Sequence, residues 1–387
     1  MLEALRTKLQ AREGAMLALI EELVLINSHT ANPAGVAQVG SILRRELESI
    51  PGVEVRELPS SRFGPHLFAR TEAARESAEG AVAIVGHHDT VFPPGSFEGF
   101  RLAEGIARGP GVLDMKGGLV VAIEALRALA ELGQLSKIPV RFGIVSDEEV
   151  GSPESRPLLQ EELRGASAAL VLEAGRAKDA IITARKGTGS MTARASGKAA
   201  HAGNAHDAGA NAIWALARFV DRAQGVTDYA RGVTVNVGKI FGGESKNTVP
   251  DRAEAVLDFR FTCTDDGHAA AASLREAAQA ACAHLPGTQV ELEGGIARTP
   301  LERTEGNLAL FREYGACARE SGLGDGEAPR LGGGSDASTT AAIGIPSIDG
   351  LGPRGSGFHT KEELIEVGTL VPKAEAIARF LLGRARP

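Results

Sequence analysis

The segment Ser146-Asp147-Glu148-Glu149-Val150-Gly151-Ser152 directly follows the apolar run of residues 139–145, near the middle of this 387-residue chain. An apolar run that ends in acidic residues and glycine is typical of a buried strand that delivers carboxylates to a sheet edge. Acidic turns are also common on solvated surfaces, so the two glutamates alone leave both interpretations open. The other polar positions of the chain favour the first interpretation.

Four further segments place a histidine or a carboxylate where a predicted strand ends or a loop begins. They contribute His87 and Asp89 after the apolar run 81–85, Asp114 ahead of a helical stretch, Glu173 after the apolar run 168–172, and His359 near the C-terminus. Ligands of open α/β sheets bind beyond the carboxyl ends of the strands. The pattern therefore predicts that these side chains meet at one edge of a sheet.

Histidine nitrogens and carboxylate oxygens together indicate a metal site. They suit zinc and neighbouring divalent ions such as cobalt or manganese. Five candidate ligands are too many for one tetrahedral zinc, but they fit two ions about 3.5 Å apart that share a bridging carboxylate. A single histidine is more often a capping or surface residue, so the prediction rests on the whole set.

In order and spacing, these segments resemble the zinc-dependent exopeptidases and deacylases. This family includes glutamate carboxypeptidase, acetylornithine deacetylase, succinyl-diaminopimelate desuccinylase and aminoacylase. The resemblance runs from about residue 26 to the C-terminus, and residues 331–336 and 352–362 look most like the glutamate carboxypeptidase branch. It implies hydrolysis of a peptide or N-acyl amide bond next to a free carboxylate. The alternative is a biosynthetic deacylase of the acetylornithine or succinyl-diaminopimelate type.

The resemblance also assigns a role to each polar residue of the predicted sheet edge. It implies two divalent ions, most simply zinc, with the ligands His87, Asp114, Glu149, Glu173 and His359. Asp114 would bridge the ions, Glu148 would be the general base that activates water, and Asp89 would orient His87. The peptide between Asp114 and Met115 is expected to be cis. No ligand position is substituted, which argues against a third hypothesis, a catalytically silent metal-binding or scaffolding protein.

Substrate-binding residues are implied in the second half of the chain. His201 resembles the histidine that polarises the substrate carbonyl, and in dimeric members it reaches the site of the neighbouring subunit. Asn247 and Arg260 would bind the substrate carboxylate, for which arginine offers a planar fork, and Gly334 would lie beside the substrate. A surface-loop histidine and a strand arginine in a surface salt bridge are the alternatives. The glycine-rich segment 332–336 lacks the Lys-Ser/Thr ending of a phosphate loop.

Alternating strand-like and helix-like segments to about residue 184 predict an α/β fold with a mostly parallel sheet and helices on both faces. A β-α-β-β-α-β pattern typical of a ferredoxin-like fold follows, in residues 189–197, 208–223, 233–240, 253–262, 269–283 and 288–293. Because His359 lies beyond this section, we expect a catalytic domain made of residues 1–185 and 298–387. Residues 186–297 would form an inserted lid and dimerisation domain of a homodimer.

Composition excludes several other classes of protein. A net charge of −7 without a basic cluster argues against a nucleic-acid partner. No stretch approaches the roughly 20 apolar residues of a membrane span. Residues 1–26 predict one amphipathic helix without the apolar centre of a signal peptide. The three widely spaced cysteines, Cys263, Cys282 and Cys317, suggest no disulfide framework, as expected in the cytoplasm.

Overall fold

The chain forms two compact units in the computed structural model, which describes residues 1–386. Unit 1 consists of Met1–Thr183, Arg303–Arg330 and the residues from Ser335 onward. Unit 2 consists of Ala184–Glu302 and Leu331–Gly334. Within residues 1–386, no helix combines the length and the apolar character needed to cross a membrane.

A six-stranded sheet forms the centre of unit 1, with the strand order β1-β2-β6-β3-β7-β14. Its strands are β1 (Val53–Leu58), β2 (His66–Thr71), β3 (Val82–His87), β6 (Val140–Val145), β7 (Ala168–Val171) and β14 (Ser347–Ile348). The pairs β3–β6, β3–β7 and β7–β14 are parallel, whereas β1–β2 and β2–β6 are antiparallel. The predicted mostly parallel sheet is confirmed, with antiparallel pairing confined to one edge.

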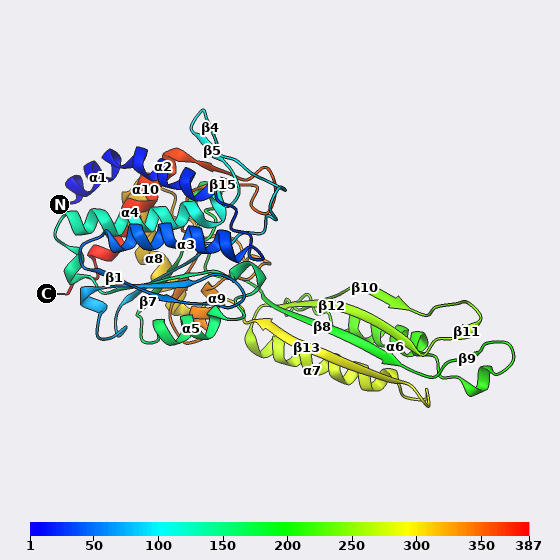
Figure 1. Cartoon of the computed structure of the whole chain (residues 1–387). Coiled ribbons are helices and arrows are strands. Elements are labelled where there is room, and N and C mark those ends of the chain that lie inside the picture. Colours follow the sequence, from blue (N-terminus) through cyan, green and yellow to red (C-terminus); the bar gives the residue numbers. More distant parts are fainter. Residues whose placement is uncertain (387) are drawn as a thin grey trace. The chain divides into compact units, whose positions relative to one another are not determined.

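Helices cover both faces of this sheet (Figure 1). They are α1 (Leu2–Ala11), α2 (Glu13–Val24), α3 (Pro33–Glu48), α4 (Gly117–Glu131), α5 (Ser155–Leu163), α8 (Glu305–Glu320), α9 (Ala337–Ala341) and α10 (Leu370–Leu382). Helices α3 and α4 pack on one face, and α5 and α9 pack on the other. A small second sheet has the order β15-β16-β5-β4, built from β4 (Arg101–Ala103), β5 (Ile106–Arg108), β15 (Gly355–Ser356) and β16 (Leu364–Glu366).

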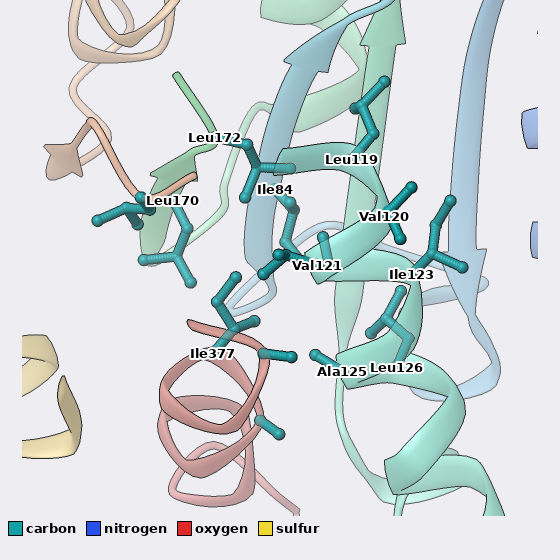
Figure 2. Close-up of a cluster of buried hydrophobic side chains, with 14 of the residues drawn as sticks. Ile84, Leu119, Val120, Val121, Ile123, Ala125, Leu126, Leu170, Leu172 and Ile377 are labelled. Carbon is teal, nitrogen blue, oxygen red and sulfur yellow. The ribbon is translucent and has the colours of Figure 1, made fainter. Parts of the chain in front are cut away.

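The core of unit 1 lies between the parallel strands and helices α4 and α10. Figure 2 shows Ile84 and Leu170 of the strands facing apolar side chains of α4, with Ile377 of α10 beside them. These three side chains are fully buried, and each such burial stabilises the fold by about 1.5–3 kcal/mol. A sheet covered by helices on both faces requires continuous apolar strands. The core therefore sets where each strand ends and where the polar residues after it begin.

The N-terminal segment differs from the single helix predicted over residues 1–26. It forms two helices, α1 and α2, separated at Arg12, which has φ −101° and ψ −1°. The Arg12 guanidinium pairs with Glu124 of α4, and Gly14, a weak helix former, follows the break. The apolar periodicity continues across the break, so the sequence pattern could not predict that the helix is interrupted.

A four-stranded antiparallel sheet with two helices forms unit 2, with the strand order β10-β12-β8-β13. The elements are β8 (Gly187–Ser196), β9 (Ala200–His201), α6 (Ala212–Gln224), β10 (Thr234–Gly242), β11 (Thr248–Val249), β12 (Arg252–Phe261), α7 (Thr264–Ala281) and β13 (Gln289–Arg298). Apart from the two-residue strands β9 and β11, their order is the predicted β-α-β-β-α-β pattern. The fold class is therefore confirmed for this unit as well.

Both helices of unit 2 begin at other residues than predicted. Helix α6 starts at Ala212 instead of 208, because the Asn211 side chain caps it by accepting a hydrogen bond from the Trp214 N–H. Helix α7 starts at Thr264 instead of 269. Asp265 and Asp266 in its first turn suit the positive end of the helix dipole, a signal that the apolar pattern did not include.

Candidate metal centre

Three parallel strands of unit 1 end at the candidate site. His87 is the last residue of β3, Glu148 and Glu149 begin a short 3₁₀ turn after β6, and Glu173 follows β7. Since β6, β3 and β7 are neighbours in the sheet, their carboxyl ends bring these side chains together. The apolar strand residues thus hold four polar side chains at one edge.

Asp114 reaches the same place from the loop before helix α4. The peptide between Asp114 and Met115 is cis, as expected. This loop is held by Glu363, whose carboxylate accepts hydrogen bonds from the backbone N–H groups of Gly111, Leu113 and Asp114, each at 2.9 Å. Three backbone donors on one carboxylate fix the position of the loop and therefore of the Asp114 side chain.

The helix that follows this loop lies unusually near strand β7. A Cβ atom on Gly118, in the first turn of α4, would lie 2.3 Å from the carbonyl oxygen of Leu172. Only glycine permits this approach. The close packing holds the start of α4 against the segment that carries Glu173.

His359 comes from the loop between β15 and β16, and its backbone has φ +62°. A histidine in this left-handed region is uncommon, and such residues cluster at functional sites. Its Nε2 atom lies 3.2 Å from Asp114 Oδ2 and 3.2 Å from Glu149 Oε2. The backbone conformation therefore directs the ring toward the other candidate ligands.

Asp114 lies between the two histidines. Its Oδ1 atom is 3.4 Å from His87 Nε2, while its Oδ2 atom faces His359. Glu173 Oε1 lies 3.9 Å from His87 Nε2 on the other side. Potential ligand atoms of His87, Asp114 and Glu149 all lie within 4.8 Å of one another, as do those of His87, Glu148 and Glu173. The two groups overlap at His87, and Asp114 is turned toward both histidines.

The crowding of buried carboxylates at this site is costly without a cation. Burial raises the pKa of Glu173 well above its ordinary value, and the Asp114 and Glu148 carboxylates raise it further. Burial also raises the pKa of Glu149, although a hydrogen bond from His359 opposes the shift. Hydrogen bonds to Asp114 and Glu149 raise the pKa of His359 to about 10. The cluster therefore favours bound positive charge.

Two orphaned oxygen atoms support the same interpretation. Among the described residues, buried Asp114 Oδ1 and Glu149 Oε1 have no hydrogen-bond partner. Buried polar atoms are nearly always satisfied, and carboxylate oxygens beside imidazole nitrogens are the donors that zinc accepts. The side chains present therefore fit divalent metal ions.

Asp89 connects His87 to the glutamate turn. The His87 Nδ1 atom is 3.0 Å from the Asp89 carbonyl oxygen and 3.5 Å from its carboxylate, which leaves Nε2 for the metal side. The Asp89 carboxylate accepts hydrogen bonds from the backbone N–H groups of Glu148 and Glu149, each at 3.2 Å, and from the Thr30 hydroxyl at 2.7 Å. The carboxylate thus holds the turn, while the Asp89 backbone carbonyl is the nearer partner of His87.

The four predicted substrate-binding residues all belong to unit 2 and fall into two pairs. His201 and Asn247 are neighbours, because β9 pairs with β11 and the Ala202 N–H donates to the Asn247 carbonyl at 2.9 Å. Arg260 lies near the other end of β12, where it donates to the carbonyl of Gly332, two residues before Gly334, at 3.3 Å. Unit 2 does not bring the two pairs together.

Each pair has a defined polar geometry. His201 is exposed, and its Nδ1 atom accepts hydrogen bonds from the N–H groups of Gly203 and Asn204 at 3.1 and 3.0 Å. A neutral His201 ring therefore carries its proton on Nε2, free to donate. The Arg260 guanidinium is held by the Asp258 carboxylate through two hydrogen bonds of 2.7 and 2.8 Å.

Two residues of the site were not found from the sequence. Glu363 and Thr30 bind, respectively, the backbone beside Asp114 and the Asp89 carboxylate. Neither has a local sequence pattern that marks it as part of the site. Only the folded chain brings them to the site, although Glu363 lies four residues after His359 and is fully buried.

Comparison with known proteins gives consistent matches along nearly the whole chain. Residues 83–383 match the family described as "Peptidase family M20/M25/M40". Carboxypeptidase G2 of Pseudomonas sp. (strain RS-16) is 30% identical over 378 residues, which cover 96% of this chain and 89% of that protein. Succinyl-diaminopimelate desuccinylase of Gluconacetobacter diazotrophicus is 27% identical, covering 94% and 96%. The crystal structure of aminopeptidase PepT from Bacillus cereus aligns with a TM-score of 0.80 at 25% identity, covering 97% and 99%.

Proposed function

Because this chain belongs to peptidase family M20/M25/M40 and is a hydrolytic enzyme, we propose that it cleaves a peptide or N-acyl amide bond adjacent to a free carboxylate. The position of Asp114 between His87 and His359 carries the proposal. A carboxylate shared in this way is the arrangement of two-metal hydrolases.

We propose two zinc ions per chain, held by the residues around Asp114. His87 and Glu173 would hold one ion, Glu149 and His359 the other, and Asp114 both. Bound zinc would supply the positive charge that acidifies a water molecule and stabilises the oxyanion of the attacked carbonyl. The orphaned oxygen atoms of Asp114 and Glu149 support these assignments.

Glu148 is the general base in this proposal. Its carboxylate has a ligand-type atom within 4.8 Å of those of His87 and Glu173, and its backbone is fixed by the Asp89 carboxylate. It would take the proton of the attacking water and deliver it to the leaving nitrogen. His201, with its proton on Nε2, would donate a hydrogen bond to the developing oxyanion.

The substrate carboxylate would bind to Arg260 and Asn247, beside Gly334. The guanidinium of Arg260 is already oriented by Asp258, so little side-chain freedom is lost when a carboxylate binds. The carboxypeptidase relative supports release of a C-terminal amino acid, and the resemblance to glutamate carboxypeptidases makes glutamate the first candidate. The desuccinylase relative, which covers nearly the whole chain, supports the alternative of a biosynthetic deacylase.

We expect the zinc-loaded protein to release glutamate from a folyl-glutamate or an N-acyl-glutamate, because a carboxylate next to the scissile bond satisfies Arg260. Amino-acid release by chromatography measures this, with N-succinyl-diaminopimelate and N-acetylornithine assayed in parallel. The amidated form of the preferred substrate is the matched control and should react at least about tenfold more slowly. Faster hydrolysis of the biosynthetic substrates would favour the deacylase, and no hydrolysis of any would contradict the proposal.

Metal binding is expected to depend on Glu363. Zinc-saturated, desalted protein should hold about two ions per chain by elemental analysis. Glu363→Ala removes the acceptor of three backbone N–H groups beside Asp114, so zinc affinity should fall by about 10- to 100-fold. Chelator competition measures the affinity. Glu362→Ala, at the exposed neighbouring position, should bind zinc as wild type does; equal affinity in both variants would contradict the role of Glu363.

The proposed assembly is a homodimer joined through unit 2. Strand β11, beside His201, ends three residues before Arg252, the first residue of β12. Arg260 stands eight residues further along β12, so the His201 pair and the Arg260 pair are separated by roughly 26 Å. That distance exceeds a small substrate, and a second copy would supply the missing pair. Ile240 and Phe241 on edge strand β10 and Trp214 on α6 are 57–60% exposed. Exposed apolar residues on an unpaired edge support an interface there.

The three cysteines support a reducing compartment. Cys263, Cys282 and Cys317 are all free thiols, as is usual for proteins of the cytoplasm. We therefore propose a cytoplasmic enzyme.

A further inference from the structure

A polar cavity lies in unit 1, at the antiparallel edge of the central sheet. It has a volume of about 290 Å³ and lies where helix α5 meets strands β1, β2 and β6. The charged residues that line it are Arg56, Arg70, Arg141 and Glu162. Three cations against one anion are unusual in a chain of net charge −7.

The arginines are placed on one face of the sheet by the strand register. Arg70 of β2 pairs directly with Arg141 of β6. Arg56 lies on β1 two residues after Glu54, the direct partner of Arg70, so the alternation of side chains puts all three arginines on the same face. Like charges directly opposite each other destabilise a sheet. Strand pairing alone therefore gives no reason for this arrangement.

Arg141 is the innermost cation of the cavity. Its side chain is 13% exposed, and its only hydrogen bond within residues 1–386 runs from Nε to the Ala74 carbonyl at 3.1 Å. The Nη1 atom lies 3.7 Å from the Glu162 carboxylate, too far for a hydrogen bond. Burial lowers the pKa of Arg141, with Arg70 and Arg56 adding to the shift against the opposing effect of Glu162. The guanidinium group of Arg141 thus has N–H donors available for another acceptor.

The neighbouring carboxylates do not balance the arginines. Glu162 is shared, since it forms an ion pair with Arg56 as well as facing Arg141. Glu54 lies 2.8 Å from Arg70 but also 3.7 Å from a further cation, Arg75. The three arginines of the cavity therefore face two carboxylates, one of them shared with Arg75, which leaves at least one positive charge uncompensated.

We propose that this cavity binds a phosphate dianion, either free or as a small monoester, through Arg141 and Arg70 with Arg56 at the rim. Guanidinium groups match phosphate oxygens in planar, paired hydrogen bonds. A bound phosphate would offset the uncompensated charge and reduce the repulsion between Arg70 and Arg141. The volume exceeds that of a phosphate group, which leaves room for part of an ester.

The site is separate from the candidate metal centre. Arg141 stands near the start of β6, whereas Glu148 follows the end of that strand. The four extended steps from Arg141 to the end of β6 at Val145 alone correspond to roughly 13 Å. A phosphate bound at the metals would therefore occupy a different place from one bound in the cavity. Substitutions of Arg56, Arg141 and Glu162 should change binding only in the cavity.

Isothermal titration of the zinc-loaded full chain with inorganic phosphate, at low salt, tests the proposal. Wild type should show a binding event that Arg141→Gln and Arg56→Gln each weaken about tenfold or more, because each loses a charge-assisted contact. Arg101→Gln, which removes an exposed arginine on β4, is the matched control and should bind as wild type does. Phenyl phosphate in the same titration decides between the free ion and an ester, since the tighter ligand identifies the source.

Glu162→Gln supplies the opposite change. Its carboxylate competes with the anion for Arg56 and Arg141, so its removal should tighten phosphate binding about threefold or more. A variant damaged in folding would not bind more tightly, so this result separates recognition from structure. If wild type, Arg56→Gln and Glu162→Gln bind phosphate identically, the phosphate binds at the metals, and the proposal is overturned.

Discussion

Glu148→Gln is expected to lower kcat by about 10² to 10⁴-fold while the protein keeps about two metal ions per chain. Glutamine has the same shape as glutamate but cannot take the proton of the attacking water. The backbone N–H of Glu148 still reaches the Asp89 carboxylate in the variant, so the turn should keep its position. Steady-state kinetics with elemental analysis of the same sample measures both quantities.

Glu149→Gln is the matched control for this loss, because it changes the adjacent residue in the same way. Glu149 faces His359 at 3.2 Å and carries an orphaned buried oxygen, so its variant should lose metal as well as activity. Metal content therefore distinguishes Glu148 as the general base from Glu149 as a metal ligand. If Glu148→Gln kept half of the wild-type kcat, Glu148 would not be the general base.

His201→Ala should cost about 10² or more in kcat, as the loss of one oxyanion donor does in other enzymes. The Nδ1 atom of His201 already accepts two backbone N–H groups, so the side chain presents only its Nε2 proton. His201 is exposed and outside the core of unit 2, so the substitution should leave folding intact. Thermal unfolding and kcat, measured on the same preparation, test this.

Subunit exchange between His201→Ala and Glu148→Gln reveals which chain supplies the histidine. If His201 acts on the partner's site, one of the two sites in the heterodimer combines an intact Glu148 with an intact His201. That heterodimer should recover about half of the wild-type activity, given independent sites. If His201 acts within its own chain, every site lacks one group and the mixture shows no recovery.

Phe241→Asp tests the interface that the exchange experiment requires. A charge on the exposed apolar edge of β10 should dissociate the dimer, and light scattering measures the mass. Activity should fall as the dimer dissociates, because a monomer has no partner to supply His201 to its active site. A wild-type monomer would contradict the dimer while leaving the hydrolase assignment intact.

Local patterns in the chain were sufficient to predict the strands of the metal centre and the residues that follow them. Apolar runs at 81–85, 139–145 and 168–172 correspond to β3, β6 and β7, and a polar residue follows each run within two positions. The parallel order of these strands then brings His87, Glu148 and Glu173 to one edge. Such positions are predictable because burial of a strand and exposure of its end are both properties of neighbouring residues.

Other features follow from contacts between distant parts of the chain and could not be predicted in this way. Glu363 binds the backbone of Asp114 across 249 positions, and Arg70 faces Arg141 across two strands. The distance that separates His201 from Arg260 depends on the register of β12 with β8. Hydrogen bonds and charge pairs of this kind depend on where the backbone has been placed by core packing. A sequence pattern describes neighbours along the chain and carries no record of partners across the fold.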